Sequence, residues 1–193
     1  LPNTQRDQAN CLLSLAASLA TRGKLADAES YYRQALTLYQ TLPGTEHNQA
    51  TCLLSLANTL RELGKPADAE PYFRQALTLY QGIPNTQREQ ATCLYNLANT
   101  LDDLGKPADA EPYYRQALTL YQDIPNTEEN QANCLYNLAN TLDDLGKPAQ
   151  AEPYYRQALT LYQTLPRTEH NQPTCLKNLA NTLHELGKQA QAP

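Results

Sequence analysis

Several residue types that build sheets or membrane spans are scarce in this sequence. Methionine, tryptophan and valine are absent, and isoleucine occurs only at Ile83 and Ile124. Strands are enriched in β-branched and aromatic residues, so the lack of β-branched runs argues against a sheet. No stretch of about 18 apolar residues occurs, which argues against a membrane-spanning helix. No signal-peptide pattern is present either.

Residues for catalysis and for nucleic-acid binding are also scarce. The formal net charge is -5, and no basic cluster could attract a phosphate backbone. His47, His170 and His184 are the only histidines and lie in no metal-binding motif, and no glycine-rich phosphate loop occurs. Asp102 and Asp103 are adjacent and lie in no catalytic or metal-binding sequence motif. We therefore predict a non-enzymatic protein that takes no cofactor or metal and binds neither nucleic acid nor membrane.

Cysteine occurs five times, always at the same position of a repeating pattern: Cys11, Cys52, Cys93, Cys134 and Cys175. These residues could form a metal or disulfide framework, or they could be small buried apolar residues. Equivalent residues on packed helices lie about 8–10 Å apart, whereas a disulfide needs Cα atoms within about 7 Å. No CxxC motif is present. We therefore expect reduced cysteines buried against the preceding repeat, and a cytoplasmic location.

The repeating pattern has a period of 41 residues. The segment NLANTLDDLGKPA occurs at residues 96–108 and again at 137–149. The period divides the chain into repeats 1–41, 42–82, 83–123, 124–164 and a shorter 165–193. A fixed period of this size is typical of a stacked array, so we predict one elongated domain over residues 1–193. The chain begins at Leu1 and ends inside a repeat, so we expect a piece of a longer protein.

The first half of each repeat has the pattern of an amphipathic helix. In the third repeat, apolar residues at helical spacing predict a helix from about Thr86 to Leu104. Thr86 and Glu89 have the spacing of an N-terminal capping box. Gly105 suits the left-handed residue that ends a helix, and Gly187 has the same place in the last repeat.

The second half predicts another helix. Apolar residues at helical spacing begin at Ala110 and continue to about Gln122. Glu111 and Arg115 form a favourable i,i+4 pair on the opposite face. Pro112 removes one backbone hydrogen bond, so we expect the helix to begin late or to bend there. Four helix pairs and one final first helix give nine helices and an all-α fold.

The spacing of apolar and small residues in the two helices resembles the tetratricopeptide repeat. In the third repeat the resemblance is carried by Leu94, Leu97, Ala98, Leu101, Gly105, Ala110, Tyr114 and Ala117. The stretch LGKPADAEPYYRQAL is similar to the longer repeats of kinesin light chains and related bacterial sensor proteins. One departure is Leu94, where an aromatic residue often opens the first helix. The resemblance implies an α-solenoid, a right-handed superhelix whose first helices line the concave face.

One face of the first helices carries polar residues outside the apolar stripe. We call them the polar row: Asn58, Tyr95, Asn96, Asn99, Asp102, Asp103, Tyr136, Asn137, Asn140, Asp143, Asp144, Lys177, Asn178 and Asn181. In tetratricopeptide arrays these positions point into the groove. Amides donate and accept hydrogen bonds, so the row could hold the backbone of an extended peptide, and its aspartates favour a partner with Lys or Arg. Alternatively, the asparagines bond to their own neighbours and solvate the face.

These observations lead to competing hypotheses about function. The first is a non-enzymatic module that binds a protein or peptide in the concave groove. The alternatives are an architectural or self-assembling sensor arm of a larger signalling protein, and a designed consensus-type scaffold. A clamp for a C-terminal carboxylate is rejected, because Arg61 and Lys177 are the only basic residues on this face. The end repeats lack polar capping units, which predicts weak head-to-tail self-association.

Overall fold

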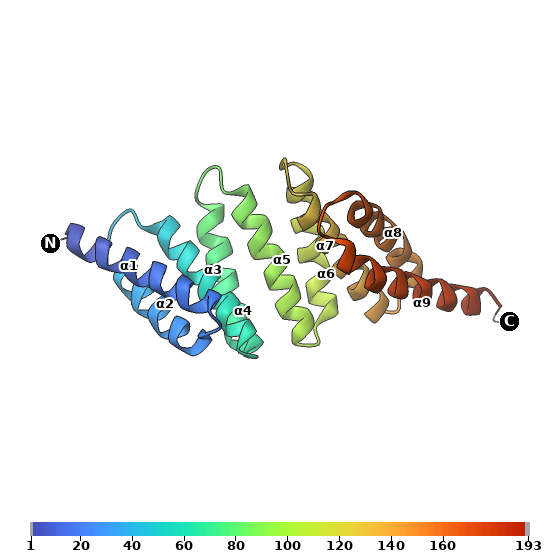
Figure 1. Cartoon of the computed structure of the whole chain (residues 1–193), viewed down its shortest axis with the longest axis horizontal. Helices are drawn as coiled ribbons and strands as arrows, with labels where there is room; N and C mark the ends of the chain where they lie inside the picture. The colour runs from blue at the N-terminus through green and yellow to red at the C-terminus, as the bar shows by residue number, and fades with distance from the viewer. Residues whose placement is uncertain (1, 192–193) are drawn as a thin grey trace. The chain divides into compact units, whose positions relative to one another are not determined.

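The computed structural model describes residues 2–191, and all regular structure in this range is helical (Figure 1). The elements are α1 (Pro2–Thr21), α2 (Leu25–Gln40), α3 (Glu46–Glu62), α4 (Pro66–Gln81), α5 (Gln87–Asp103), α6 (Pro107–Gln122), α7 (Glu128–Asp144), α8 (Pro148–Thr164), the 3-10 helix η1 (Glu169–Asn171) and α9 (Gln172–Gln191). For the described residues, the predicted all-α class and nine α-helices are confirmed.

The chain divides into two compact units, one up to Leu104 and one from Gly105. Unit 1 contains α1 to α5, and unit 2 contains α6 to α9 with η1. Within each unit every helix packs on the next helix along the chain, and neighbouring first helices also touch: α1 on α3, α3 on α5, and α7 on α9. This consecutive packing of helix pairs is the arrangement of an α-solenoid.

A buried threonine joins each first helix to the end of the second helix before it. Thr86 Oγ1 lies 2.6 Å from the carbonyl oxygen of Tyr80 and 2.8 Å from that of Ile83, at the end of α4. Gln90 Nε2 donates to the same Tyr80 carbonyl at 3.2 Å. The last carbonyls of a helix have no partner within it, and here Thr86 and Gln90 supply one. Thr86 makes no side-chain cap for α5, so the predicted capping box with Glu89 is wrong.

The same contact recurs in both units. The equivalent threonines Thr45, Thr127 and Thr168 are buried and reach the equivalent tyrosine carbonyls. A threonine that the sequence pattern placed at the start of one helix therefore bonds to the carbonyls at the end of the helix before it. The difference arises because the preceding helix packs against this threonine, and its open carbonyls attract the hydroxyl.

We expect the substitution Thr86→Val to lower the free energy of unfolding by about 1–3 kcal/mol, because it removes the buried hydroxyl that donates to the carbonyls of Tyr80 and Ile83. Chemical denaturation would measure this loss, provided that the unfolding free energy of the variant depends on denaturant concentration as steeply as that of the wild type. Thr78→Val is the control, since the Thr78 hydroxyl is exposed and bonds only to its own helix at Arg74. It should change stability by no more than about 0.5 kcal/mol. Equal effects of both substitutions would contradict the role given to Thr86.

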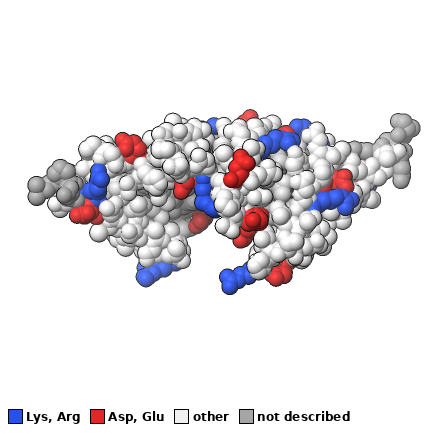
Figure 2. All heavy atoms as spheres, turned by 90° about the horizontal axis from the view of Figure 1, so that it is seen from above, with Lys and Arg blue, Asp and Glu red and all other residues white. Residues whose placement is uncertain are grey.

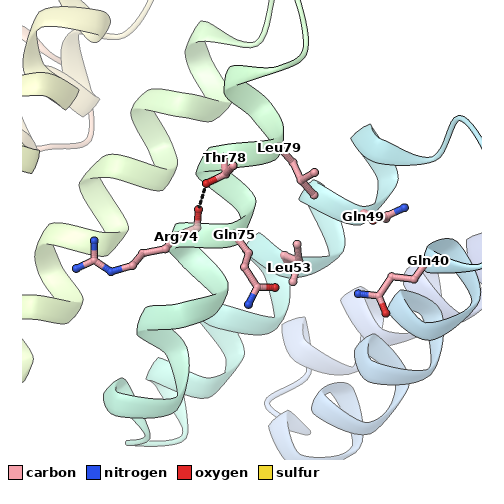
Figure 3. Close-up of a pocket in the computed structure, with 7 residues that line it drawn as sticks. All are labelled: Gln40, Gln49, Leu53, Arg74, Gln75, Thr78 and Leu79. Atoms are coloured by element: carbon pink, nitrogen blue, oxygen red, sulfur yellow. Dashed lines mark hydrogen bonds between the residues drawn. The ribbon is translucent and has the colours of Figure 1, made fainter.

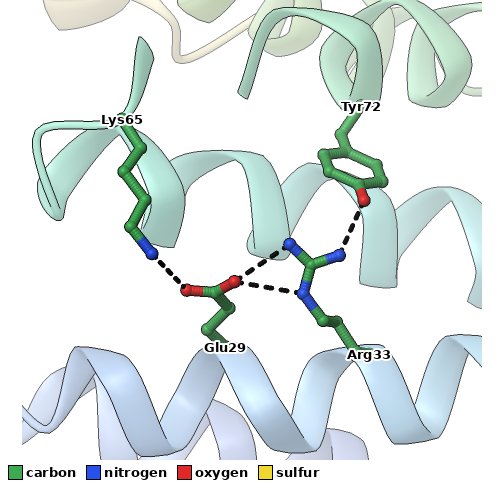
Figure 4. Close-up of polar contacts among 4 residues, drawn as sticks. All are labelled: Glu29, Arg33, Lys65 and Tyr72. Atoms are coloured by element: carbon green, nitrogen blue, oxygen red, sulfur yellow. Dashed lines mark hydrogen bonds and ion pairs between the residues drawn. The ribbon is translucent and has the colours of Figure 1, made fainter. Parts of the chain in front are cut away.

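The second helices are linked by a charged ladder, shown in Figure 4. Glu29 accepts hydrogen bonds from Arg33 at 2.9 and 3.1 Å, which confirms the predicted kind of i,i+4 pair. It also pairs with Lys65 of the next repeat at 3.1 Å, and Arg33 donates to the Tyr72 hydroxyl at 2.7 Å. Burial raises the pKa of Glu29, but the hydrogen bonds from Lys65 and Arg33 outweigh burial, so its pKa is lowered.

This lowered pKa predicts an acid-sensitive contribution to stability. Unfolded Glu29 would titrate near 4.5 and folded Glu29 below that value. The contribution is therefore present above about pH 4.5 and lost as pH falls through the folded pKa. Glu29→Gln should lower stability at neutral pH and flatten the loss in acid, as measured by urea unfolding across the acid range. Asp7→Asn is the control, since Asp7 is exposed and no described residue pairs with it. Parallel pH curves for wild type and Glu29→Gln would contradict this assignment.

Two helix boundaries differ from the sequence prediction. Helix α6 begins at Pro107 and continues through Pro112 to Gln122, so the expected late start is wrong. Gly187 lies inside α9, so the predicted helix end there is also wrong. In repeat 3, by contrast, Gly105 has φ +69°. Pro107 is not the cause of this difference, since Gly23 has φ +73° although Leu25 stands at the place of that proline in the first repeat.

Candidate functional site

The polar row lies on α3 and α5 in unit 1 and on α7 and α9 in unit 2. Most of its members are partly enclosed by neighbouring side chains rather than fully solvated. The half-buried members are Asn58, Tyr95, Asn96, Asn99, Asp102, Tyr136, Asn137, Asn140, Asp143 and Asn178. The exposed members are Asp103, Asp144, Lys177 and Asn181. Side chains that are held in place in this way can be oriented before any partner arrives.

In unit 2 the structure brings members of the row from two repeats together around Asn140. The Asn140 Oδ1 atom accepts a hydrogen bond from the Tyr155 hydroxyl of α8 at 2.7 Å. It accepts another from Asn178 Nδ2 of α9 at 2.9 Å. Asn178 Nδ2 also donates to the Tyr136 hydroxyl at 3.0 Å. Two asparagines of the row therefore bond directly to each other and to two tyrosines.

Asp143 extends this network by one turn of α7. Its Oδ2 atom lies 2.6 Å from the Thr182 hydroxyl of α9 and 3.1 Å from the Tyr155 hydroxyl. Burial raises the pKa of Tyr155, and the nearby Asp143 carboxylate raises it further, so Tyr155 remains a protonated donor. The aspartate is thereby fixed between three helices, α7, α8 and α9.

The network leaves specific hydrogen-bonding groups unused. Asn140 uses its oxygen internally, and no described residue accepts from its Nδ2 group. Asn178 uses its nitrogen internally, and no described residue donates to its Oδ1 atom. Each free asparagine amide could have both donated and accepted. Here Asn140 offers only donors to a partner, and Asn178 offers only an acceptor.

A hollow of about 270 Å³ adjoins this network in unit 2. Its lining residues come from α7, the start of α8 and α9: Asp143, Gly146, Pro148, Asn181, Thr182 and Glu185. The hollow is therefore lined by two carboxylates, one from α7 and one from α9, and by the exposed amide of Asn181. Asp143 and Asn181 belong to the polar row, whereas Gly146, Pro148 and Thr182 enter only through packing of the helices.

Unit 1 has a different arrangement at the equivalent place. Phe73 replaces the tyrosine found at Tyr155, so it has no hydroxyl to donate. Among the residues that the structure describes, the Asn58 side-chain amide has no hydrogen-bond partner. Asn58 therefore keeps both its donors and its acceptor, whereas Asn140 has lost its acceptor to the network.

The sequence prediction missed Tyr155 and Thr182 as parts of this site. Neither residue belongs to the polar face of the first helices that defines the row. Tyr155 is in the apolar stripe of α8, and Thr182 is a buried residue of α9. A signal was available, because a tyrosine or threonine hydroxyl in an apolar stripe must find a partner when it is buried.

A second hollow, of about 370 Å³, lies in unit 1 among α2, α3 and α4 (Figure 3). Its lining residues are Gln40, Gln49, Leu53, Arg74, Gln75, Thr78 and Leu79. None of them belongs to the polar row. Gln49 is already committed to the structure, since its Nε2 group donates to Thr45 Oγ1 at 3.0 Å. This hollow lies between two successive second helices, α2 and α4, next to the core residue Leu53 of α3.

The cysteines form no disulfide, and four of the five are buried. Cys52 Sγ donates to the carbonyl of Tyr32 in the preceding repeat at 3.1 Å, and Cys134 makes the same contact with Tyr114 at 3.2 Å. Burial raises the pKa of both thiols to about 12. Cys11 is exposed, so the predicted burial is wrong for this residue, because no second helix precedes α1 in the described chain. Within the described range, no group of three His, Cys, Asp or Glu residues could hold a metal ion.

We expect one thiol to react quickly with a maleimide at neutral pH and four to react slowly. Cys11 should be the fast one, because a thiol buried with a raised pKa has little thiolate available. Quenched labelling followed by peptide mass mapping would measure the order. Cys11→Ser is the control variant and should remove the fast phase while leaving the slow phase unchanged. Two or more fast thiols in the native protein would contradict this assignment.

Charge is dispersed over the described surface that Figure 2 shows. Lys and Arg atoms lie there in small separate groups, with Asp and Glu atoms near several of them. Ion pairs also occur among the described residues, such as Lys147 with Glu111 at 2.9 Å. No helix in the described range is both long and apolar enough to cross a membrane.

Comparison with known proteins adds a family and a fold. The family model described as Tetratricopeptide repeat matches residues 7–82, 72–123, 89–164 and 130–192. The crystal structure of BtubC (BKLC) from P. vanneervenii matches with a TM-score of 0.81 at 23% identity, covering 96% of this chain and 76% of that one. The comparison with curated proteins gives no match.

A second solved structure is a kinesin light chain-type protein of Podosopora anserina with nearly identical TPR-like repeats. It matches with a TM-score of 0.76 at 14% identity, covering 96% of this chain and 90% of that one. A single-residue variant of the same protein gives a TM-score of 0.77 at 15% identity. At these identities the likeness is one of fold, and it agrees with the consecutive helix pairs described above.

Proposed function

Because the chain belongs to the tetratricopeptide repeat family, whose members generally serve as protein-interaction modules, we propose that it binds an extended peptide segment along the polar row. Repeats of this family are typically non-enzymatic scaffolds. The partner is a protein that presents its main chain to the asparagines of the row. The row belongs to the first helices, the part of the repeat that faces the groove in tetratricopeptide arrays.

The observation that carries this proposal is the network around Asn140. Its bonds to Tyr155 and Asn178 fix the two asparagine side chains in one geometry. Fixing polar groups before binding reduces the entropy lost on association. A peptide backbone alternates carbonyls and N–H groups, so it can satisfy both the Asn140 donors and the Asn178 acceptor. The row can thus hold main chain while placing few demands on side chains.

The charges of the row favour a partner with Lys or Arg. Asp143 and Glu185 both line the hollow of unit 2. Asp144, which follows Asp143 in the chain, is exposed. A cationic side chain in this hollow would gain charge-assisted hydrogen bonds. Lys177 is the only basic member of the row, so it leaves the acidic character of the row largely intact.

Peptides selected from a displayed random library on the intact protein would test this function. The selected peptides should contain more Lys and Arg than the starting library. Asn58→Ala and Asp144→Ala should each weaken the binding of a selected peptide by about 3- to 10-fold, the range expected for one lost hydrogen bond. Titration of a labelled peptide would measure the change. Asn140→Ala is a poorer test, because it would leave Tyr155 and Asn178 without their acceptor.

Gln157→Ala is the matched control, since Gln157 is an exposed amide on α8 outside the polar row. It should bind the selected peptide with unchanged affinity. If all three variants bound equally well, the polar row would not be the peptide site. Circular dichroism should be the same for every variant, because substitutions at such positions change stability by about 0.5 kcal/mol or less.

A further inference from the structure

A groove lies between the second helices α2 and α4 of unit 1, and none of the residues that line it belongs to the polar row. One part of the groove is the 370 Å³ hollow shown in Figure 3. The other part is a hollow of about 390 Å³, lined by Arg33, Ala67, Asp68, Pro71, Tyr72 and Gln75. Gln75 lines both hollows. The two hollows therefore follow one another along α4, and we call them together the α2–α4 groove.

The end of the groove near Leu79 combines apolar side chains with free amides. Leu53 and Leu79 both line it. The Thr78 hydroxyl donates to a carbonyl of its own helix at 2.9 Å, so it is not available to a ligand. Gln40 extends from α2 and Gln75 from α4 (Figure 3), and neither amide has a hydrogen-bond partner among the described residues. This end can hold an apolar side chain while the amides bond to the main chain that carries it.

The other end of the groove presents hydrogen-bond acceptors. Pro71 has no N–H, so the Ala67 carbonyl one turn earlier receives no hydrogen bond from it, although α4 continues through this proline. Ala67 is exposed and lines the groove beside Asp68. Asp68 is also exposed, and no described residue pairs with its carboxylate. A carbonyl and a carboxylate next to each other suit a ligand that is positively charged and donates hydrogen bonds.

Two nearby cations leave Asp68 open because both are used elsewhere. Lys65 pairs with Glu29 at 3.1 Å, and Arg33 donates to the same carboxylate and to the Tyr72 hydroxyl (Figure 4). An acidic residue in the first turn is favoured by the helix dipole, which accounts for Asp68 on its own. The dipole does not account for a hollow beside Asp68 or for the carbonyl that the proline leaves open.

Unit 2 contains a neutral version of the same place. Lys147 pairs with Glu111 at 2.9 Å, as Lys65 does with Glu29, and α8 also has a proline, Pro153, inside it. Gln150, however, stands where α4 has Asp68. The chain therefore offers an internal comparison in which the charge is the main difference.

We propose that the α2–α4 groove binds an extended peptide of a partner protein in which a Lys or Arg lies four residues from an apolar residue. The basic side chain bonds to Asp68 and to the Ala67 carbonyl, and the apolar side chain lies against Leu79. Asp68 and Leu79 are about 16 Å apart along α4, at 1.5 Å per residue. In an extended chain, side chains four residues apart point the same way and span about 13 Å, and the long basic side chain covers the remainder.

Photo-crosslinking to the intact protein would locate and measure this binding. The probes are two end-blocked pentapeptides, benzoylphenylalanine-Ser-Ser-Ser-Lys and the same residues in reverse order, which cover both directions of the bound chain. Light couples benzoylphenylalanine to the residue beside it, and peptide mapping identifies the helix. The labelled fragments of α4 and α8 differ in mass, since GIPNTQR follows the shared stretch in one and TLPR in the other. We expect at least one probe to label α4 near Leu79, with a yield that saturates as the probe concentration rises.

Variants at equivalent positions of three second helices test which residue binds the cation. Asp68→Asn should lower the labelling of α4 about 3- to 10-fold, because it removes the charge and keeps the shape. Asp27→Asn is the matched control, since Asp27 has the same place in the first turn of α2 but lines neither hollow. It should leave the labelling unchanged. Gln150→Asp should raise the labelling of α8 by a similar factor. All three residues are exposed, so the variants should keep the circular dichroism of the wild type.

A third probe with norleucine in place of lysine should label α4 about 3- to 10-fold less than the lysine probe. The proposal is overturned if no probe labels α4, if the norleucine and lysine probes label it equally, or if Asp68→Asn and Asp27→Asn behave alike. It is also overturned if the label falls on the first helices that carry the polar row, because the probe would then occupy that site instead of the α2–α4 groove.

Discussion

The fold depends on covering each first helix from two sides. One side, with residues such as Leu53, packs on the second helix of the same repeat, and the other, with Cys52, packs on the repeat before. A single repeat can provide only one of these two covers, so no repeat completes its own core. Stability of such an array comes from the interfaces between neighbours as much as from the repeats themselves. The buried threonine and the charged ladder both strengthen the same interface.

The helices could be predicted from the sequence because they follow from short-range patterns. Apolar spacing placed α5 within one residue at each end and α6 to its last residue, Gln122. Thr86 was misassigned because its partner, the carbonyl of Tyr80, belongs to another helix. Gly187 was misassigned because a glycine permits a helix to end but does not enforce it. In both cases the structure depends on something outside the short sequence motif on which the prediction was based.

The candidate site was predictable in its location and less so in its chemistry. The sequence pointed to Asn140 and Asn178 as members of one polar face, and the structure places them in contact. It could not reveal that each amide uses one of its two ends internally, because Tyr155 and Thr182 reach the row only through tertiary packing. Asn140 and Asn178 thus bond to their neighbours, and each keeps one kind of hydrogen-bonding group that no described residue uses.

The repeats differ from one another where the row lies and agree where the second helices meet. All four second helices share the stretch YYRQALTLYQ except for Phe73, whereas the position of Asp143 is occupied in turn by Ala20, Arg61, Asp102, Asp143 and His184. The shared stretch is constrained by its contacts: its arginine bonds to the first tyrosine of the next repeat, as Arg33 does to Tyr72, and its last tyrosine bonds within its own repeat, as Tyr39 does to Asn10. The single exception has a local effect on the row. Phe73 removes the hydroxyl that would occupy the oxygen of Asn58, so the second helix determines how much of each asparagine is left for a partner.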